Sequence, residues 1–390
     1  MNNPRITVVI PVYNMKESIG KAIESFWDQC YPNKELMVLD ACSTDGTLDV
    51  INKYRDKIDY LVSQKDDGPS HAIAENIKYA TGDYIALLGA DDRYEEGALQ
   101  IAADTIADTN ADVVYGDCNF IYPNGDIIRK SAAKRGIENL YYYNTIFSNA
   151  AFVRKALLEN YYKTIWSANR NQIDVSTDHL LWLDLYHKKY VFESIDSDKA
   201  ISFYNAAGRS NSNEYRGCID DIRIIRLVLQ GDEEAQKKYM PTFNKYLAAR
   251  AIMGYEKALG VDGFREVVKR YINSESNYII WGTGDMSRKI VRLIELSEGN
   301  VKYFVDNNYK LNPGGYMGKD ICNPDAIQKE KDVTVIIGAL GNEKVIHEQI
   351  NKMYIDGSVR IEDYADIADR IQEDIGIDKL EKAWENGVLK

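Results

Sequence analysis

The chain has 390 residues, and at roughly 100–200 residues per domain this length predicts two or three domains. Apolar residues make up 45% of the sequence and aromatic residues 11%, which is enough to build an ordinary globular core. The 48 basic and 60 acidic side chains give a formal net charge of −12. This charge argues against a general nucleic-acid-binding protein, because such proteins need a basic face.

The cysteines and the N-terminus indicate where the protein works. The five cysteines are odd in number, scattered and free of any CxxC pair, so neither a disulfide framework nor a structural zinc site is expected. The opening MNNPRITVVIPVYN has a short apolar run without a small-residue cleavage site, which is typical of a first strand and not of a signal peptide. The longest uncharged stretch, 139–153, is too short to span a bilayer. We therefore expect a cytoplasmic protein, which leaves open peripheral association with the inner face of the membrane.

The first half of the chain alternates apolar strands with amphipathic helices. The continuous apolar run Ile6–Ile10 predicts a strand covered on both faces, and Lys16–Gln29 has the apolar spacing of a helix. Further strands are expected at 35–39, 59–62, 84–88 and 112–115, and further helices at 48–54, 70–80 and 97–107. This repetition predicts an α/β fold with a mostly parallel sheet, helices on both faces, and ligands at the carboxyl ends of the strands.

The second half of the chain starts with a hairpin signal and ends with another α/β pattern. Asn124-Gly125 predicts the turn between strands at 119–122 and 126–129. Expected next are a helix at 176–186, strands at 190–195 and 200–204, and helices at 218–230 and 233–259. From Tyr278, the run YIIWGTGDMSRKIVRLIEL predicts a strand, a glycine turn and a helix. We therefore expect an α/β domain at 1–216, a helical connector at 217–275, a small Rossmann-like α/β domain at 276–360 and a helical tail at 361–390.

Polar side chains follow several of the expected strands. Asp91 and Asp92 follow the strand DYIALLGA, and two adjacent carboxylates there suit a hard divalent cation completed by a phosphate. A solvated turn or a helix cap is the alternative. Asp40 and Pro11–Tyr13 end two other strands, where a carboxylate and an aromatic ring would line a base pocket. Lys65, in the loop KDDGPS, would neutralise a diphosphate near a helix N-terminus, although a charged turn explains it equally well.

Together, ITVVIPVYN, DACSTDGT, KDDGPSHAIAENIKYATGDYIALLGADD and the later TDHLLWL resemble the family 2 glycosyltransferases, which have the GT-A fold. The likeness covers about residues 6–216. It implies that Ala90-Asp91-Asp92 is the DXD metal motif without its first acid, with Asp92 as the direct ligand of Mn²⁺ or Mg²⁺ and Asp91 near the ribose or sugar. It also implies a nucleotide-diphospho-sugar donor, usually a UDP-sugar, with Asp40 on the base and Pro11, Val12 and Tyr13 beside it. We expect Lys65 and Asp67 to bind the same donor. The implied acceptor is a hydroxyl of a glycan or lipid-linked glycan in surface polysaccharide biosynthesis.

The same resemblance places Asp178, in STDHL, at the position of the catalytic base. The alternative is a first-turn acid stabilised by the helix dipole. One carboxylate base and no covalent nucleophile imply inversion at the anomeric carbon. Arg209 would meet the diphosphate from a flexible Gly-Arg-Ser stretch, and Asn149 falls where related sequences place acceptor-site residues. The aromatic run Tyr141–Tyr143 would either stack on acceptor sugars or simply pack.

The second α/β pattern imitates a dinucleotide-binding fingerprint. Gly282-Thr283-Gly284 is followed by Asp306 at roughly the 20-residue distance that the fingerprint asks, but its third glycine is missing. We therefore favour a scaffold domain, of the kind appended to some sugar-modifying enzymes, over a bound NAD or other nucleotide. The alternative functions are a nucleotide-sugar oxidoreductase or epimerase, which would need a Tyr-x-x-x-Lys pair that is not found near these residues, and a non-catalytic nucleotide-sugar-binding protein.

Overall fold

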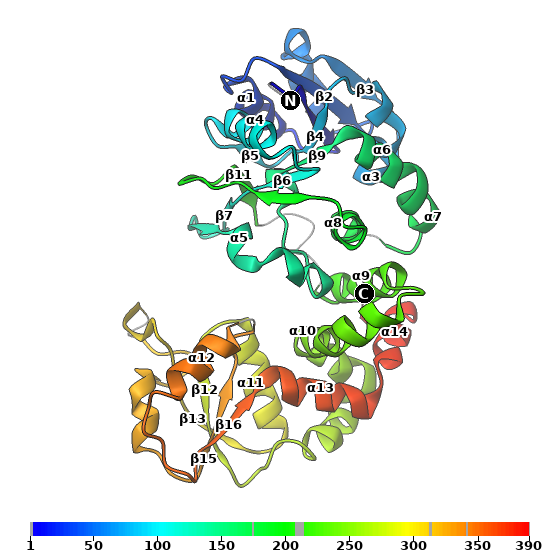
Figure 1. Cartoon of the computed structure of the whole chain (residues 1–390). Coiled ribbons are helices and arrows are strands. Elements are labelled where there is room, and N and C mark those ends of the chain that lie inside the picture. The colour runs from blue at the N-terminus through cyan, green and yellow to red at the C-terminus, as the bar shows by residue number, and fades with distance from the viewer. Residues whose placement is uncertain (1–2, 174, 207–213, 312–313, 341, 390) are drawn as a thin grey trace. The chain divides into compact units, whose positions relative to one another are not determined.

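The computed structural model describes residues 3–173, 175–206, 214–311, 314–340 and 342–389, and the chain divides into two compact units (Figure 1). The first unit contains residues 1–213 and 223–230, and the second contains residues 214–222 and 231–390. Within the described residues, no helix combines the length and the apolar character that crossing a bilayer requires.

The first unit is built on a seven-stranded sheet. Its strands are β1 (Ile6–Val12), β2 (Lys34–Asp40), β3 (Tyr60–Ser63), β4 (Tyr84–Leu87), β6 (Val113–Tyr115), β9 (Ala151–Arg154) and β10 (Phe192–Ser194). They lie in the order β10-β6-β9-β4-β1-β2-β3, and every neighbouring pair is parallel except the two that β9 makes. The α/β class and the mostly parallel sheet predicted from the sequence are confirmed.

Helices connect these strands, and the sheet is buried beneath them. They are α1 (Ile19–Trp27), α2 (Thr47–Asn52), α3 (Pro69–Asn76), α4 (Ala98–Thr109), α5 (Ala132–Arg135), α6 (Lys155–Tyr161), α7 (Ser167–Asn169) and α8 (Thr177–His187). Ile6, Val8 and Ile10 on one face of β1 join a core with Ile23 of α1 and Leu99 of α4. Burying each such side chain stabilises the folded state by about 1.5–3 kcal/mol. This gain explains why apolar side chains occur on both faces of β1.

Strand β9 was missed by the sequence-based expectation. It lies inside the sheet and runs antiparallel to both neighbours, with Ala86 of β4 opposite Phe152 and Tyr115 of β6 opposite Ala151. Four residues make too short an apolar run to separate from the surrounding loop. Because β9 runs against its neighbours, the residues before it lie at the same edge of the sheet as the residues after β4 and β6.

The sequence ATGDYI, which carried much of the resemblance, has a structural role. Glu35 is buried in β2 and accepts hydrogen bonds from the Thr7 hydroxyl and from the backbone N–H of Thr81, the latter at 2.8 Å. A Cβ on Gly82 would lie 2.5 Å from the Thr7 hydroxyl oxygen and 2.6 Å from the Thr7 backbone nitrogen. These residues therefore position the segment that leads into β4. The candidate chemical groups come after β4, in the turn that contains Asp91 and Asp92.

A second, four-stranded sheet lies beside the first and carries the predicted hairpin. Its strands are β5 (Arg93–Tyr94), β7 (Cys118–Ile121), β8 (Ile127–Lys130) and β11 (Ser202–Asn205), in the order β5-β11-β7-β8. Strands β7 and β8 pair antiparallel around Gly125, whose φ of 88° explains the glycine in the turn. The start of β5 follows Asp92 directly, so this sheet borders the candidate site.

The second unit contains a parallel sheet and most of the remaining helices. The helices are α9 (Glu214–Val228), shared between the units, α10 (Glu233–Val268), α11 (Asp285–Leu296), α12 (Glu343–Ile350), α13 (Tyr364–Ile375) and α14 (Ile377–Glu385). The strands are β12 (Asn277–Trp281), β13 (Asn300–Val305), β14 (Ile321–Cys322), β15 (Val333–Ile337) and β16 (Arg360–Asp363). Their order is β14-β13-β12-β15-β16, which in chain order reads 3-2-1-4-5, as in doubly wound nucleotide-binding sheets.

Candidate active site

Asp92 is a buried acid at the carboxyl end of the first sheet. Its side chain is 8% exposed, and it accepts hydrogen bonds from the backbone N–H of Asn205 at 3.0 Å and from Asn149 Nδ2 at 3.1 Å. Burial raises the pKa of Asp92 to about 7, although both hydrogen bonds favour the charged form. An ionised Asp92 in this place is therefore stabilised by a positive partner.

The Asp91 and Asp92 carboxylates lie against Gly89. A Cβ on Gly89 would lie 2.8 Å from Asp92 Oδ2 and 3.2 Å from Asp91 Oδ1, so a side chain at this position would crowd both carboxylates. The described residues form no group of three or more His, Cys, Asp or Glu that could hold a metal ion. A cation here would take one or two carboxylates from the protein and its other ligands from phosphates and water, which is how Mg²⁺ sites at nucleotides are built.

Asp178 lies in the first turn of α8 and is held by three donors. Its Oδ2 accepts from Asn144 Nδ2 at 2.9 Å and from the Ser148 hydroxyl at 2.8 Å, and its Oδ1 accepts from the backbone N–H of His179 at 2.9 Å. Ser148 is itself held by the buried Trp182, whose Nε1 donates to the hydroxyl at 3.1 Å. These contacts fix the orientation of a partly exposed carboxylate, which a proton acceptor for an incoming hydroxyl needs.

His179 is a structural neighbour of this carboxylate. It is 3% exposed, and its Nε2 lies 2.7 Å from the backbone oxygen of Leu140. The ring is therefore turned away from solvent, so His179 is a neighbour of the carboxylate and not a base.

Phe147-Ser148-Asn149 connects the two acidic positions. Ser148 binds Asp178, and the next residue, Asn149, binds Asp92. Both lie in the short 3₁₀ turn η4 (Ser148–Ala150), immediately before the antiparallel strand β9. Asn149 is only 7% exposed, so the structure places it against Asp92 and not on an open acceptor surface.

The residues predicted to bind the nucleotide gather at the ends of β1, β2 and β3. Asp40 is 1% exposed and accepts from the Ser63 hydroxyl at 2.5 Å and from the backbone N–H of Ser43 at 3.3 Å. Asp40 and Lys65 line the same small cavity, of about 20 Å³. This volume holds a water molecule and not a base, so a base can reach Asp40 only if the cavity widens.

The carboxyl end of β1 is open, unlike the small cavity beside Asp40. Pro11 and Val12 lie within β1, whereas the Tyr13 side chain is 57% exposed and presents a free aromatic face. The loop is held by its neighbour, because the backbone N–H of Asn14 donates to the Ser43 hydroxyl and that of Lys16 to Asp45. Ser43 therefore supports this turn, and Asp45 both supports it and accepts from the backbone N–H of Thr47, the first residue of α2, at 2.9 Å.

The loop of Asp67 connects the nucleotide side to the Asp178 helix. Gly68 has a φ of 113° and precedes Pro69 at the start of α3. Ser70 Oγ lies 3.0 Å from Thr177 Oγ1, at the start of α8. Asp67 donates its backbone N–H to His71 Nδ1 at 3.1 Å, which explains His71 as a loop-holding residue. Arg209 lies outside the described residues.

Sequence reasoning missed three supporting residues, namely Asn144, Ser148 and Asn205. Asn205, on β11, donates its backbone N–H to Asp92 and its side-chain amide to Asp91 Oδ2 at 3.4 Å. All three are common polar residues without a local motif, so only the fold brings them to the two acids. Of the aromatic run, Tyr141 is buried and hydrogen-bonded to His187, whereas Tyr142 and Tyr143 are partly exposed.

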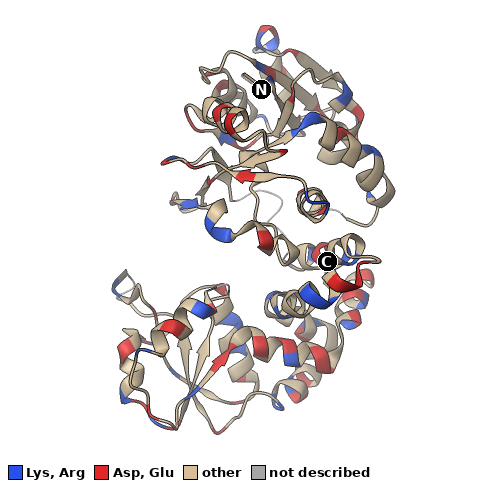
Figure 2. Cartoon of the chain, viewed as in Figure 1, with Lys and Arg blue, Asp and Glu red and all other residues tan. Residues whose placement is uncertain are grey.

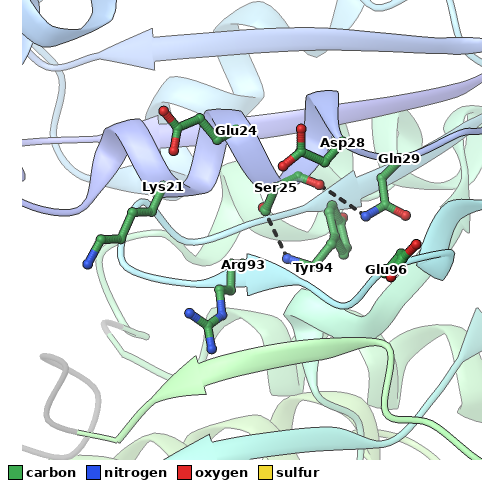
Figure 3. A pocket seen from close by; sticks show the side chains of 8 residues that line it. All are labelled: Lys21, Glu24, Ser25, Asp28, Gln29, Arg93, Tyr94 and Glu96. Atoms are coloured by element: carbon green, nitrogen blue, oxygen red, sulfur yellow. Dashed lines mark hydrogen bonds between the residues drawn. The ribbon is translucent and has the colours of Figure 1, made fainter.

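A separate hollow of about 450 Å³ lies between α1 and β5 (Figure 3). Polar side chains that line it are engaged in hydrogen bonds within the fold. Ser25 accepts from the backbone N–H of Tyr94, and Gln29 donates to the backbone oxygen of Ser25. Basic Lys21 and Arg93 are mixed there with three acids. It contains none of the residues predicted for the active site.

Comparison with known proteins identifies the first unit. Residues 7–168 match the model of the family described as glycosyl transferase family 2. The chain is 32% identical over 127 residues to the glycosyltransferase AglE of Haloferax volcanii, which covers 31% of this chain and 42% of AglE. It is 26% identical over 238 residues to the GalNAc(5)-diNAcBac-PP-undecaprenol β-1,3-glucosyltransferase of Campylobacter jejuni, covering 58% of this chain and 74% of that one. The chain thus spans less than half the length of AglE.

Two further matches complete the comparison. Residues 274–361, in the second unit, match a family described as C2185-like, N-terminal. Among solved structures, TarS residues 1–349 of S. aureus in complex with UDP-GlcNAc align with a TM-score of 0.49 and 22% identity, over 68% of this chain and 81% of that one.

Proposed function

From the premise that residues 7–168 belong to glycosyl transferase family 2, we propose that the whole chain is an inverting, metal-dependent glycosyltransferase. It transfers a sugar from a nucleotide-diphospho-sugar, a UDP-sugar by our proposal, to a hydroxyl of a glycan or lipid-linked acceptor in surface polysaccharide synthesis. The observation that carries this proposal is the connection of Asp92 and Asp178 through consecutive residues of one turn, Ser148 and Asn149. A cation-binding carboxylate and an oriented carboxylate are the two groups that this reaction requires.

Asp92, with Asp91 beside it, would hold Mn²⁺ or Mg²⁺ against the donor diphosphate. When bound, the cation supplies Lewis-acid neutralisation of the departing diphosphate. Asn205 and Asn149 keep Asp92 turned toward Gly89. The Tyr13 face would stack on the base, and Asp40 and Lys65 would meet the nucleotide after their small cavity opens.

Asp178 would accept the proton of the acceptor hydroxyl as that oxygen attacks the anomeric carbon. Ser148 and Asn144 both donate to Oδ2, so Oδ1 is the oxygen with fewer side-chain donors. The glycosidic bond to the diphosphate breaks on the opposite side of the sugar, and the configuration inverts. The proton ends on Asp178 and the electron pair on the leaving nucleoside diphosphate.

Calorimetric titration with UDP, with and without Mn²⁺, tests the proposal. We expect metal-dependent UDP binding that Asp92→Asn removes, and Asp178→Asn should keep that binding but lose roughly 10²–10⁴-fold in transfer. GDP, dTDP and NAD serve as parallel ligands. NAD binding without UDP binding would move the function to the second unit and contradict the proposal.

A further inference from the structure

Two cations beside the loop that binds Asp178 are held over aromatic rings, and among the described residues neither has an acidic partner. The Arg135 guanidinium, at the end of α5, lies 5.2 Å from the ring centres of both Tyr143 and Phe147. The Lys130 ammonium, at the end of β8, lies 4.0 Å from the ring centre of Phe120. The Phe120 and Phe147 rings meet edge to face with their centres 5.4 Å apart, so the two cations and the rings form one continuous group. This group, called the strip below, consists of Lys130, Phe120, Phe147, Tyr143 and Arg135.

The strip is unusual in its charge balance. Within the part of the chain that the structure describes, neither Arg135 nor Lys130 forms an ion pair with a carboxylate, although acids outnumber bases in the sequence by 60 to 48. Arg135 Nε is buried without a hydrogen-bond partner, and burial lowers the pKa of Arg135. Leaving a buried donor of a charged group without a partner is unfavourable for folding.

The strip is connected to the proposed catalytic base. Arg135 Nη2 donates to the backbone oxygen of Asn144 at 2.6 Å, and the Asn144 side chain donates to Asp178 at 2.9 Å. Phe147 is the residue before Ser148, which also binds Asp178. Arg135, Lys130 and the three rings are all partly exposed, so a ligand can reach them. Figure 2 shows basic residues on α5.

We propose that Arg135 and Lys130, with Phe120, Tyr143 and Phe147, form the acceptor subsite and bind an acceptor that carries an oxyanion, a phosphate or a carboxylate, next to the attacking hydroxyl. The rings provide apolar faces for a sugar ring, and the planar guanidinium matches either oxyanion through two parallel hydrogen bonds. This inference rests on the proposed function, because it names the substrate class of the site that contains Asp178.

Ligand-observed NMR titration of the full chain in EDTA tests the inference. The probes are glucose 1-phosphate, glucuronic acid and the neutral methyl glucoside. We expect at least one anionic sugar to bind about 10-fold or more tightly than the neutral one, which is about 1.4 kcal/mol. Preference for glucose 1-phosphate would identify a phosphate-bearing acceptor, and preference for glucuronic acid would identify a uronate-containing glycan. Equal binding of all three probes would overturn the inference.

Variants of the strip separate a ligand-binding role from a structural one. Arg135→Met and Lys130→Met should each lose the preference for the anionic sugar, whereas Lys134→Met should keep it, because Lys134 is exposed on the same short helix. Arg135→Met removes the unpartnered Nε and also the hydrogen bond to Asn144, so thermal unfolding is measured alongside, and Lys130→Met is the variant that leaves this hydrogen bond in place. Unchanged anion binding in both Arg135→Met and Lys130→Met would refute the subsite.

Metal-dependent UDP binding distinguishes this inference from the proposed function. Arg135→Met should bind UDP with Mn²⁺ as the parent chain does. A loss of UDP affinity in this variant would assign Arg135 to the donor and overturn the inference while leaving the glycosyltransferase proposal in place. Failure of the parent chain to bind UDP would instead refute the proposed function, whatever the anionic sugars do.

Discussion

Removing the Ser148 hydroxyl tests whether Asp178 acts as an oriented base. Ser148→Ala deletes one of the two side-chain hydrogen bonds to Asp178 Oδ2, at 2.8 Å, and leaves the one from Asn144, at 2.9 Å. A hydrogen bond to a charged group contributes about 1.5–3 kcal/mol, which corresponds to roughly 10–150-fold in rate if it is needed in the transition state. Because Asn144 remains, we expect the lower end, a fall in kcat of about 10-fold with unchanged affinity for UDP and Mn²⁺.

The assay for this change is UDP release from the UDP-sugar that supports turnover, combined with calorimetric UDP titration. Ser148→Ala also leaves the buried Trp182 Nε1 without its acceptor, so thermal unfolding must be measured alongside. Ser148→Thr keeps a hydroxyl and should restore much of kcat, and Ser167→Ala, on an exposed serine of α7, is the control. An unchanged kcat in Ser148→Ala, or an equal loss in Ser148→Thr, would refute the orientation of Asp178 by this residue.

Three further substitutions test the candidate cation site and the fold beneath it. Gly89→Ala places a Cβ 2.8 Å from Asp92 Oδ2. We therefore expect metal-dependent UDP binding to be lost, while the thermal stability without metal changes little. Normal Mn²⁺-dependent binding of UDP in this variant would contradict a cation site at Asp92. Asn149→Ala removes the 3.1 Å hydrogen bond to Asp92. It should weaken Mn²⁺ binding by about 10–100-fold, because loss of a residue that supports a metal ligand has this effect. A manganese titration followed by electron paramagnetic resonance measures the Mn²⁺ affinity. Gly82→Ala drives a Cβ to 2.6 Å from the Thr7 backbone and should destabilise the chain by about 1–3 kcal/mol in urea unfolding, whereas Gly217→Ala, whose Cβ meets nothing closer than 3.7 Å, should not.

The sequence was sufficient to predict the repeated strands and helices of the fold. Long apolar runs such as Ile6–Ile10 are strands because burial on both faces favours apolar side chains along most of the run, and that preference is visible locally. The Asn124-Gly125 hairpin was equally visible, because the turn needs a residue that tolerates a positive φ. Strand β9 was hidden, because its four residues, three of them apolar, satisfy many local structures equally well.

The candidate site was predicted only where a residue carries its own chemistry. Adjacent carboxylates at Asp91 and Asp92 are visible as a concentration of charge, and the structure places both of them against Gly89. The groups that hold them, Asn149 and Asn205, come from positions 57 and 113 residues away, where nothing in the local sequence distinguishes them from other asparagines. The unsatisfied Nε of Arg135 is likewise a property of the packed chain and not of its sequence.

The antiparallel direction of β9 explains why one turn serves both acids. Residues after β4 and residues before β9 must meet at the same edge of the sheet, because Ala86 lies opposite Phe152 and the two strands run in opposite directions. Counting along this pairing, the turn that ends at Asp92 meets the turn that contains Ser148 and Asn149. In a wholly parallel sheet, the residues before the neighbouring strand would lie at the far edge, about one strand length away. The single reversed strand therefore brings a third polar loop to the catalytic edge, and it fixes Asp178 and Asp92 relative to each other through one backbone segment.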